Sequence, residues 1–372
     1  MSLRRSVQPT RVSLQRVRLR PDIRFCTAAD GAKIAVGTYG SGPPLVRAGT
    51  WLTHVEYDAT SPLSAHWCEE LAKHHRYVAY DGRGCGLSDR GVRDLSLDVF
   101  VADLEAVVDG LGLGRFPLLG TSMGAPVAVA YAAKHPERVS RLVLHGGFHR
   151  SYLSSTNPDP RVLEEADVLF KSARLGWGTG SLALRQVFVA KFMGESTGAQ
   201  RQAFDERQRL TSTADVAEKY LRAMFALDVK ELAPRVSCPT IAFHSRGDQL
   251  VSLEQGRKLA TLIPGARFVP LESKNHVPFR EEHAWQALVA ALRSFLDEEG
   301  GVRTSSPAKE LTSRQLDVLR GVARGLADKE IASELSLSPR TVEMHVARAL
   351  AALECANRAQ AVRRAVALGV LD

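Results

Sequence analysis

The chain lacks the features that mark membrane, secreted and metal-binding proteins. No apolar run approaches the roughly 18 residues that a membrane-spanning helix needs, so we expect a soluble protein without membrane contact. The five cysteines are odd in number, scattered and without C-x-x-C spacing, which indicates neither a disulfide framework nor a zinc site. We therefore expect no metal, no cofactor and a reducing, cytoplasmic setting.

The first twenty residues also lack what a secretory signal requires. They contain six arginines and no acidic residue, but no continuous apolar segment. Residues 1–20 are thus expected to form a basic tail that either binds nucleic acid or stays solvated. This tail, together with ten basic and eight acidic side chains in residues 309–372, accounts for the net charge of +8 and leaves the segment between them neutral.

Length and patterning predict two domains. The 372 residues exceed the roughly 100–200 that are usual for one domain. Residues 21–296 alternate short apolar strands with longer amphipathic stretches, which is typical of an α/β fold with a mostly parallel sheet. Residues 297–309 are rich in glycine and serine and predict a linker, after which helical signals resume over residues 310–372.

A strand, a tight turn and a helix surround Ser122. The apolar run 116–119 enters Gly120-Thr121-Ser122-Met123-Gly124, and a helix rich in alanine and valine follows over residues 125–134. Glycines at the two flanking positions, Gly120 and Gly124, let the backbone turn sharply and raise the serine hydroxyl above the edge of the sheet. Ser122 is therefore the candidate nucleophile.

A serine hydroxyl is a poor nucleophile at neutral pH, so it needs a base that a third group orients. Asp248 follows the apolar strand 239–244, and His276 follows the strand 266–271. Asp248 is the candidate orienting carboxylate and His276 the candidate base. Each residue also has a structural interpretation, as an unreactive serine, a turn former or a packed histidine, but their order at three strand ends favours a triad.

From about residue 24 to residue 295 the chain resembles the α/β-hydrolase fold, in which the triad follows the order Ser, Asp, His. The run 80–88, YDGRGCGLS, is similar to the D-x-R-G-x-G-x-S loop of that family. The resemblance implies an oxyanion hole made by the backbone N–H groups of Met123 and Thr50, with Trp51 as the alternative to Thr50. Ala48 stands where many relatives have histidine, a change that backbone donors tolerate.

Between about residues 147 and 235 the strand pattern lapses. Helices are predicted at residues 162–170, 182–192 and 214–225, which implies a helical cap over the site. The cap carries six large apolar side chains, namely Trp177, Phe188, Phe192, Met193, Met224 and Phe225. These side chains either line a pocket for an apolar ligand or pack the cap against the sheet.

Residues 310–372 predict an all-α domain of four helices. Thr312 and Gln315 form a capping box that begins the first helix, and Gly325 ends it. A short helix over residues 328–335 is followed by Ser338 and Pro339, a capping residue and a first helical residue. The inner face of this third helix is predicted from Val342, Val346, Leu350 and Leu353, and a last helix spans about 358–368.

Two short helices joined by a turn, with the second presented outward, have the geometry of a helix-turn-helix that enters the major groove of DNA. The candidate DNA-contacting residues are Lys329, Arg340, Thr341, Glu343, Met344, His345, Ala347 and Arg348. The motifs Leu311-Thr312-Ser313-Arg314, Lys329-Glu330-Ile331-Ala332, Thr341-Val342 and Asn357-Arg358 resemble the LuxR-type domain, which implies binding to double-stranded DNA, as a homodimer. Relatives often have lysine at the position of Glu343.

The two resemblances lead to three hypotheses. In the favoured one, the protein is a transcription regulator whose hydrolase domain binds, and can hydrolyse, a small ester or lactone-like ligand. The alternative is a serine hydrolase of the esterase or lactonase type with an appended DNA-binding domain. In a third, the hydrolase domain serves only as a dimerisation platform.

Overall fold

The computed structural model describes residues 19–151, 154, 159–179, 181–297, 312–352, 355, 357–367 and 371. The chain divides into two compact units, Met1–Glu299 and Gly300–Asp372. All but the last two residues of the expected tail at 1–20, and all but the first residue of the expected linker at 297–309, lie outside the described residues. No helix in the described ranges has the length and apolar character that a membrane span requires.

The first unit is built on an eight-stranded sheet with the order β1-β2-β4-β3-β5-β6-β7-β8. The strands are β1 Asp22–Thr27, β2 Lys33–Tyr39, β3 Pro44–Arg47, β4 Arg76–Tyr80, β5 Phe116–Thr121, β6 Val139–His145, β7 Thr240–Ser245 and β8 Arg267–Leu271. β1 and β2 pair antiparallel, as do β2 and β4, whereas all the pairs from β4 to β8 are parallel. Every residue of β7 is buried, as expected of a parallel strand covered on both faces.

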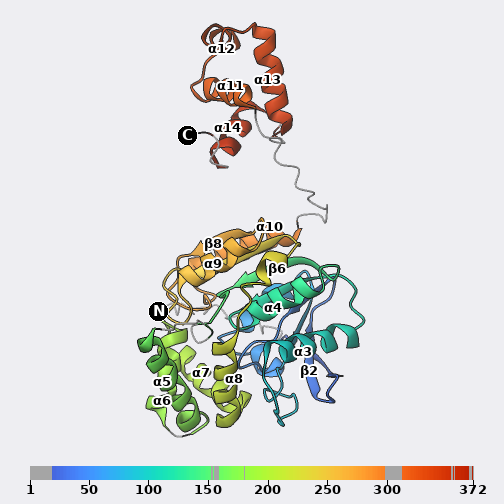
Figure 1. The fold of residues 1–372 in the computed structure, drawn as a ribbon, viewed down its shortest axis with the longest axis vertical. Coiled ribbons are helices and arrows are strands. Elements are labelled where there is room, and N and C mark those ends of the chain that lie inside the picture. Colours follow the sequence, from blue (N-terminus) through green and yellow to red (C-terminus); the bar gives the residue numbers. More distant parts are fainter. Residues whose placement is uncertain are drawn as a thin grey trace, which may run out of the picture. The chain divides into compact units, whose positions relative to one another are not determined.

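Helices cover both faces of this sheet (Figure 1). On one face, α3 (Leu97–Gly110), α4 (Gly124–Lys134) and α9 (Leu253–Leu262) contribute to the larger apolar core. On the other face, α2 (Ala65–Leu71) and α10 (His283–Asp297) form a second core around Trp67 and Trp285. A short helix, α1 (Val55–Asp58), lies in the connection between β3 and α2.

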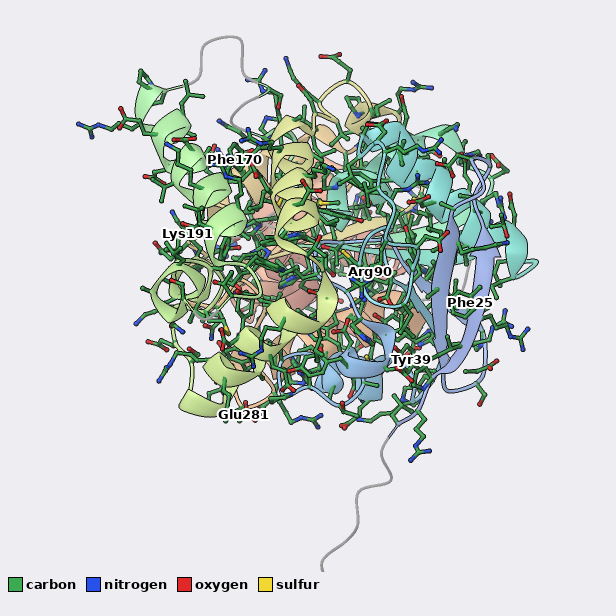
Figure 2. The ribbon with its side chains drawn as sticks, turned by 90° about the horizontal axis from the view of Figure 1, so that it is seen from below. Phe25, Tyr39, Arg90, Phe170, Lys191 and Glu281 are labelled. Atoms are coloured by element: carbon green, nitrogen blue, oxygen red, sulfur yellow. The ribbon has the colours of Figure 1, made fainter. Side chains whose placement is uncertain are left out.

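Four further helices form a cap between β6 and β7. They are α5 (Pro160–Gly176), α6 (Leu182–Phe192), α7 (Gly198–Thr211) and α8 (Ala214–Ala226). The cap helices that carry Phe170 and Lys191 lie on the opposite side of this unit from Phe25 on the edge strand β1 (Figure 2). Three of the four helices correspond to predicted segments, whereas α7 was not predicted from the sequence.

The second unit consists of α11 (Ser313–Ala323), α12 (Asp328–Leu335), α13 (Pro339–Ala352) and α14 (Arg358–Ala367). The predicted capping box is present, because Thr312 Oγ1 accepts from the N–H of Gln315 and Gln315 Oε1 accepts from the N–H of Thr312. Ser338 caps α13 by accepting from the N–H of Thr341. Val318, Ile331, Ala332, Val342 and Val346 form one buried core cluster of this unit.

Candidate functional site

Ser122 lies in the turn between β5 and α4 with a φ of +53°, in the left-handed region that non-glycine residues rarely adopt. This conformation costs about 1–3 kcal/mol, so the surrounding structure has to hold it. The N–H of Ser122 donates to the carbonyl of His145 at the end of β6 (2.8 Å), and its carbonyl accepts from the N–H of Ala125 in α4 (2.9 Å). The turn is thereby fixed at the carboxyl edge of the sheet.

The turn has no room for a side chain at Gly120 or Gly124, the two glycines that flank the nucleophile. A Cβ atom on Gly120 would lie 2.6 Å from the carbonyl oxygen of Gly124 and 2.7 Å from Cα of Ala125. A Cβ atom on Gly124 would lie 2.9 Å from the carbonyl oxygen of Gly49. The glycines therefore let α4 start directly against β5 and against the loop after β3.

Asp248 and His276 come together from the loops that follow β7 and β8. His276 Nδ1 donates to Asp248 Oδ2 at 2.6 Å, and both side chains are buried. The N–H groups of Leu250 and Val251 donate to Asp248 Oδ1 at 2.9 and 3.0 Å. The carboxylate is thus held on both oxygens, and it fixes the tautomer and the orientation of the imidazole.

Two opposing effects act on the Asp248 carboxyl group. Burial raises its pKa, but the charge of His276, the hydrogen bond from His276 and the N–H of Val251 together outweigh burial and hold the pKa below its ordinary value. Asp248 is therefore ionised at neutral pH.

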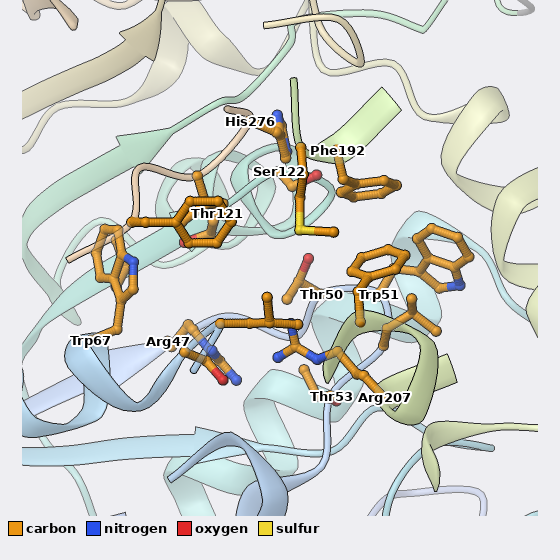
Figure 3. A pocket seen from close by; sticks show the side chains of 18 of the residues that line it. Arg47, Thr50, Trp51, Thr53, Trp67, Thr121, Ser122, Phe192, Arg207 and His276 are labelled. Atoms are coloured by element: carbon orange, nitrogen blue, oxygen red, sulfur yellow. The ribbon is translucent and has the colours of Figure 1, made fainter. Parts of the chain in front are cut away.

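His276 Nε2 is buried and has no hydrogen-bond partner among the described residues. His276 and Ser122 line the same cavity, where they lie beside each other (Figure 3). A Cβ on Gly146 would lie 2.8 Å from His276 Cε1, which shows how closely the ring packs on the end of β6. With Nδ1 bound to Asp248, Nε2 is the nitrogen left to accept a proton.

The expected oxyanion loop follows β3 and packs on the start of α4. The N–H of Ala48 donates to the carbonyl of Leu119 in β5 at 2.8 Å, which ties the loop to the strand that leads to Ser122. Thr50 and Trp51 both line the cavity, and Met123 is the buried residue that precedes α4. Thr50 and Met123 also line one small cavity together.

The cap side chains divide between the cavity and the core. Phe192 and Met193 line the cavity. Trp177 and Phe188 instead pack on Trp51, with ring centroids 5.2 and 5.7 Å away, and Phe225 packs on Phe170. Met224 is buried in the main core. Only two of these six side chains line the cavity, so the wall for an apolar ligand is smaller than their number suggests.

Several residues around the site were not singled out from the sequence. Arg47, Trp67 and Arg207 line the cavity together with Ser122. Two further histidines, His54 and His244, differ in position: His54 caps α1, whereas His244 Nε2 lies 3.5 Å from Asp248 Oδ2. His244 donates to the carbonyl of Val251 at 2.8 Å, so it supports the loop that carries Asp248. Within the described ranges, no group of three or more His, Cys, Asp or Glu side chains could hold a metal ion.

The candidate DNA-contacting residues lie on α12 and α13 of the second unit. Six of them are exposed: Lys329, Arg340, Glu343, Met344, Ala347 and Arg348. Thr341 and His345 are half-buried, and Thr341 Oγ1 lies 2.8 Å from Ser338 Oγ at the start of α13. Because Val342, Val346 and Ala349 bury the opposite side of α13, the exposed side chains share one face.

Comparisons with known proteins agree with this division. The family described as alpha/beta hydrolase fold matches residues 59–282, and the family described as bacterial regulatory proteins, luxR family, matches residues 309–365. The putative carbamate hydrolase RutD of Caulobacter sp. (strain K31) is 26% identical over 201 residues, which cover 53% of this chain and 72% of that protein. The non-heme haloperoxidase of Rhodococcus erythropolis is 27% identical over 270 residues, 68% of this chain and 92% of the relative.

The first unit is similar in fold to solved structures of other proteins. The esterase EaEST from Exiguobacterium antarcticum matches 73% of this chain and 98% of its own chain, with a TM-score of 0.62 and 24% identity. The predicted fold classes, an α/β-hydrolase fold with a cap and a four-helix domain, are confirmed. The chain belongs to the alpha/beta hydrolase fold family, and it joins a domain of that family to a C-terminal DNA-binding domain of the luxR family of bacterial regulatory proteins.

Proposed function

We propose that this protein is a DNA-binding transcription regulator whose hydrolase domain binds a small ester or lactone at Ser122 and hydrolyses it. One observation carries the proposal. His276 is hydrogen-bonded to Asp248 through Nδ1 at 2.6 Å, its Nε2 has no partner among the described residues, and it lines one cavity with the strained Ser122. A nucleophile, a base and an orienting carboxylate are thereby assigned to three residues.

In the proposed reaction, Ser122 Oγ attacks the carbonyl carbon of the ester while His276 Nε2 takes the hydroxyl proton. The N–H groups of Met123 and Thr50 hold the negative oxygen of the tetrahedral intermediate. His276 then gives its proton to the departing alcohol, which leaves an acyl group on Ser122. Water, activated by the same histidine, releases the acid and restores the serine.

The DNA-binding half of the proposal uses the exposed face of α13. Arg340 and Arg348 supply positive charge for contacts with DNA phosphates. The Glu343 carboxylate either accepts a hydrogen bond from a cytosine amino group or weakens binding by repelling a nearby phosphate. With ten basic and eight acidic side chains in residues 309–372, the domain has little excess charge for a single contact. We therefore propose that it binds duplex DNA as a homodimer, which doubles the contact surface.

A serine hydrolase with an appended DNA-binding domain is the second candidate. The orientation of His276 by Asp248 favours it, because a pure receptor has no need of a base held in one tautomer. The rate of turnover separates the two candidates. A hydrolase releases many product molecules per minute, whereas a regulator binds its ligand and turns it over slowly.

The test measures hydrolysis of p-nitrophenyl butyrate by the full chain and by Ser122→Ala. We expect the variant to lose roughly a thousandfold or more of kcat/KM, because no step can proceed without the nucleophile. Ser140→Ala is the matched control: Ser140 lies on β6 near the opposite end of the strand from His145. It should keep the wild-type rate.

Equal hydrolysis by wild type and Ser122→Ala would exclude Ser122 as the nucleophile. Binding of both proteins to duplex DNA from upstream of their own gene is measured in parallel. If neither protein hydrolyses the ester and both bind the DNA, the hydrolase domain is a receptor without turnover.

A further inference from the structure

The cavity that contains Ser122 has a second, basic end. It has a volume of about 130 Å³, roughly ten times the space that one water molecule needs. Arg47, the last residue of β3, and Arg207, from the cap helix α7, line it together with Ser122 and His276. Figure 3 shows the two guanidinium groups turned toward each other, on the side of the cavity away from Ser122 and His276.

The two arginines share a single carboxylate. Arg47 Nη2 lies 3.5 Å from Asp58 Oδ2, and Arg207 Nη2 is paired with Asp58 Oδ1. The side chain of Asp58 is 1% exposed, and those of Arg47 and Arg207 are 12% and 17% exposed. None of the described residues that line the cavity is an aspartate or a glutamate. Two guanidinium groups and one carboxylate leave one positive charge largely removed from water, an arrangement that an anion stabilises.

Three hydrogen-bond donors of residues that line the cavity also lack partners. Nε of Arg207 and Nε1 of both Trp67 and Trp51 are buried and make no hydrogen bond within the described part of the chain. Trp67 is 7% exposed and lines the cavity. A buried donor left unpaired costs about 1–3 kcal/mol, so an acceptor bound here would recover that cost. An ionised carboxylate only accepts hydrogen bonds, and its two oxygens can receive them from a guanidinium fork and from an indole N–H.

The walls between the two ends are largely apolar. Phe192 and Met193 come from the cap, and Leu119 and Val277 come from the sheet side. Such walls suit a short hydrocarbon chain between a reacting carbonyl group and a charged end group.

We propose that Arg47, Arg207 and Trp67 form a subsite for the carboxylate of a ligand that carries its ester or lactone carbonyl at Ser122. The ligand is then a small half-ester of a dicarboxylic acid, or a lactone with a free carboxylate. The placement of the ligand's carbonyl group at Ser122 rests on the proposed function. The preference of the two arginines for an anionic ligand does not depend on it.

The first test compares two esters of equal length, mono-p-nitrophenyl glutarate and p-nitrophenyl valerate, which differ in a terminal carboxylate. We expect wild type to prefer the glutarate ester, and Arg207→Gln to lower the ratio of the two kcat/KM values by roughly 10- to 100-fold, as for the loss of a charge-assisted hydrogen bond. Arg209→Gln, on the exposed side of the same helix, is the matched control and should keep the wild-type ratio. An unchanged ratio in a folded Arg207→Gln protein would overturn the subsite while leaving the esterase intact.

A binding measurement tests the subsite even if the protein does not hydrolyse either ester or if Arg207→Gln does not fold. Calorimetry of the full-length Ser122→Ala protein with glutarate and with neutral glutaramide should give at least tenfold tighter binding of glutarate. Arg207→Lys in that background, which keeps the charge and loses the fork, should weaken glutarate binding. Selective glutarate binding without hydrolysis of either ester would support the subsite and contradict catalysis. Equal binding of glutarate and glutaramide would overturn the subsite.

Discussion

At the scale of single residues, the hydrogen bond to Asp248 decides which histidine can act as the base. His145, His244 and His276 lie close together at the carboxyl ends of the strands, with the rings of His145 and His276 6.5 Å apart. Burial, together with the charges of His276 and His244, lowers the pKa of His145 to about 3. Burial also lowers the pKa of His244. Both are therefore neutral at pH 7, and of the three histidines only His276 is hydrogen-bonded to Asp248, whereas His244 Nε2 binds the carbonyl of Val251.

The neutral His145 predicts that the hydrolase domain loses stability in mild acid. Its imidazole binds a proton in the unfolded chain below about pH 6.5 and in the folded chain only near pH 3. The unfolded state is therefore favoured as pH falls through this window, by about 1.4 kcal/mol per pH unit for one proton. His145→Leu should remove this contribution and reduce the loss of unfolding free energy between pH 6.5 and 4.5 by about 2–3 kcal/mol.

Urea unfolding followed by tryptophan fluorescence measures this change. All four tryptophans, at positions 51, 67, 177 and 285, belong to the hydrolase domain, so the signal reports on that domain alone. His74→Leu, at an exposed position, is the control for the loss of one histidine. If His145→Leu and His74→Leu have the same pH dependence, His145 is not the proton acceptor on unfolding.

The residues of the proposed triad could be predicted because each follows an apolar strand in the sequence, and parallel strands bring their carboxyl ends to one edge. Arg47 and Arg207 could not be predicted in this way. They are separated by 160 positions, and nothing in either segment indicates that both guanidinium groups meet Asp58. Only the fold reveals that their charges are not balanced.

At the scale of elements, the connection from β5 to α4 tolerates few substitutions, because its glycines are in close contact with neighbouring backbone atoms. Gly120→Ala would place a Cβ 2.6 Å from the Gly124 carbonyl oxygen and 2.8 Å from Cβ of Ala128. These are backbone and helix atoms that cannot move without shifting α4. We expect a loss of about 1–3 kcal/mol in unfolding free energy, as for other overpacked sites.

The same urea titration tests this expectation, with Gly114→Ala as the control just before β5. A Cβ on Gly114 would meet no atom within 4 Å. Its replacement should leave stability nearly unchanged or slightly increased. Equal stability of the two variants would mean that the turn at Ser122 tolerates the added atom, and that the packing of α4 on β5 is not what fixes the nucleophile.

Elements with a strong local signal could be predicted closely, and an element without one was missed. The start of α11 after its N-cap Thr312 and that of α13 at Pro339 follow from capping residues, and both are confirmed. Helix α7 has mostly polar residues, and only Ala203 and Phe204 of its apolar side chains are buried, so its apolar periodicity is weak. Its one sequence signal was the capping box of Thr197 and Gln200. Missing α7 also meant missing Arg207.

At the scale of the whole molecule, two units with separate apolar cores are joined in one chain. The sequence predicted both fold classes because each has its own motifs, a nucleophile turn in one and capped helices in the other. It could not predict the ligand, since the shape and charge of the cavity arise from side chains of β3, α2, α7 and the loop after β8. The proposed regulation requires that a ligand bound to one unit changes the affinity of the other for DNA.

The most direct measurement of that coupling is the affinity of the full chain for duplex DNA before and after Ser122 is phosphonylated with a small fluorophosphonate. We predict stoichiometric labelling of wild type and a change in DNA affinity of about 5- to 150-fold, the usual range of coupling between two sites. Ser122→Ala, treated in the same way, should remain unlabelled and keep its affinity. Complete labelling of Ser122 with no change in DNA affinity would contradict a regulator that senses its ligand through the hydrolase domain, and would leave a hydrolase with an independent DNA-binding domain.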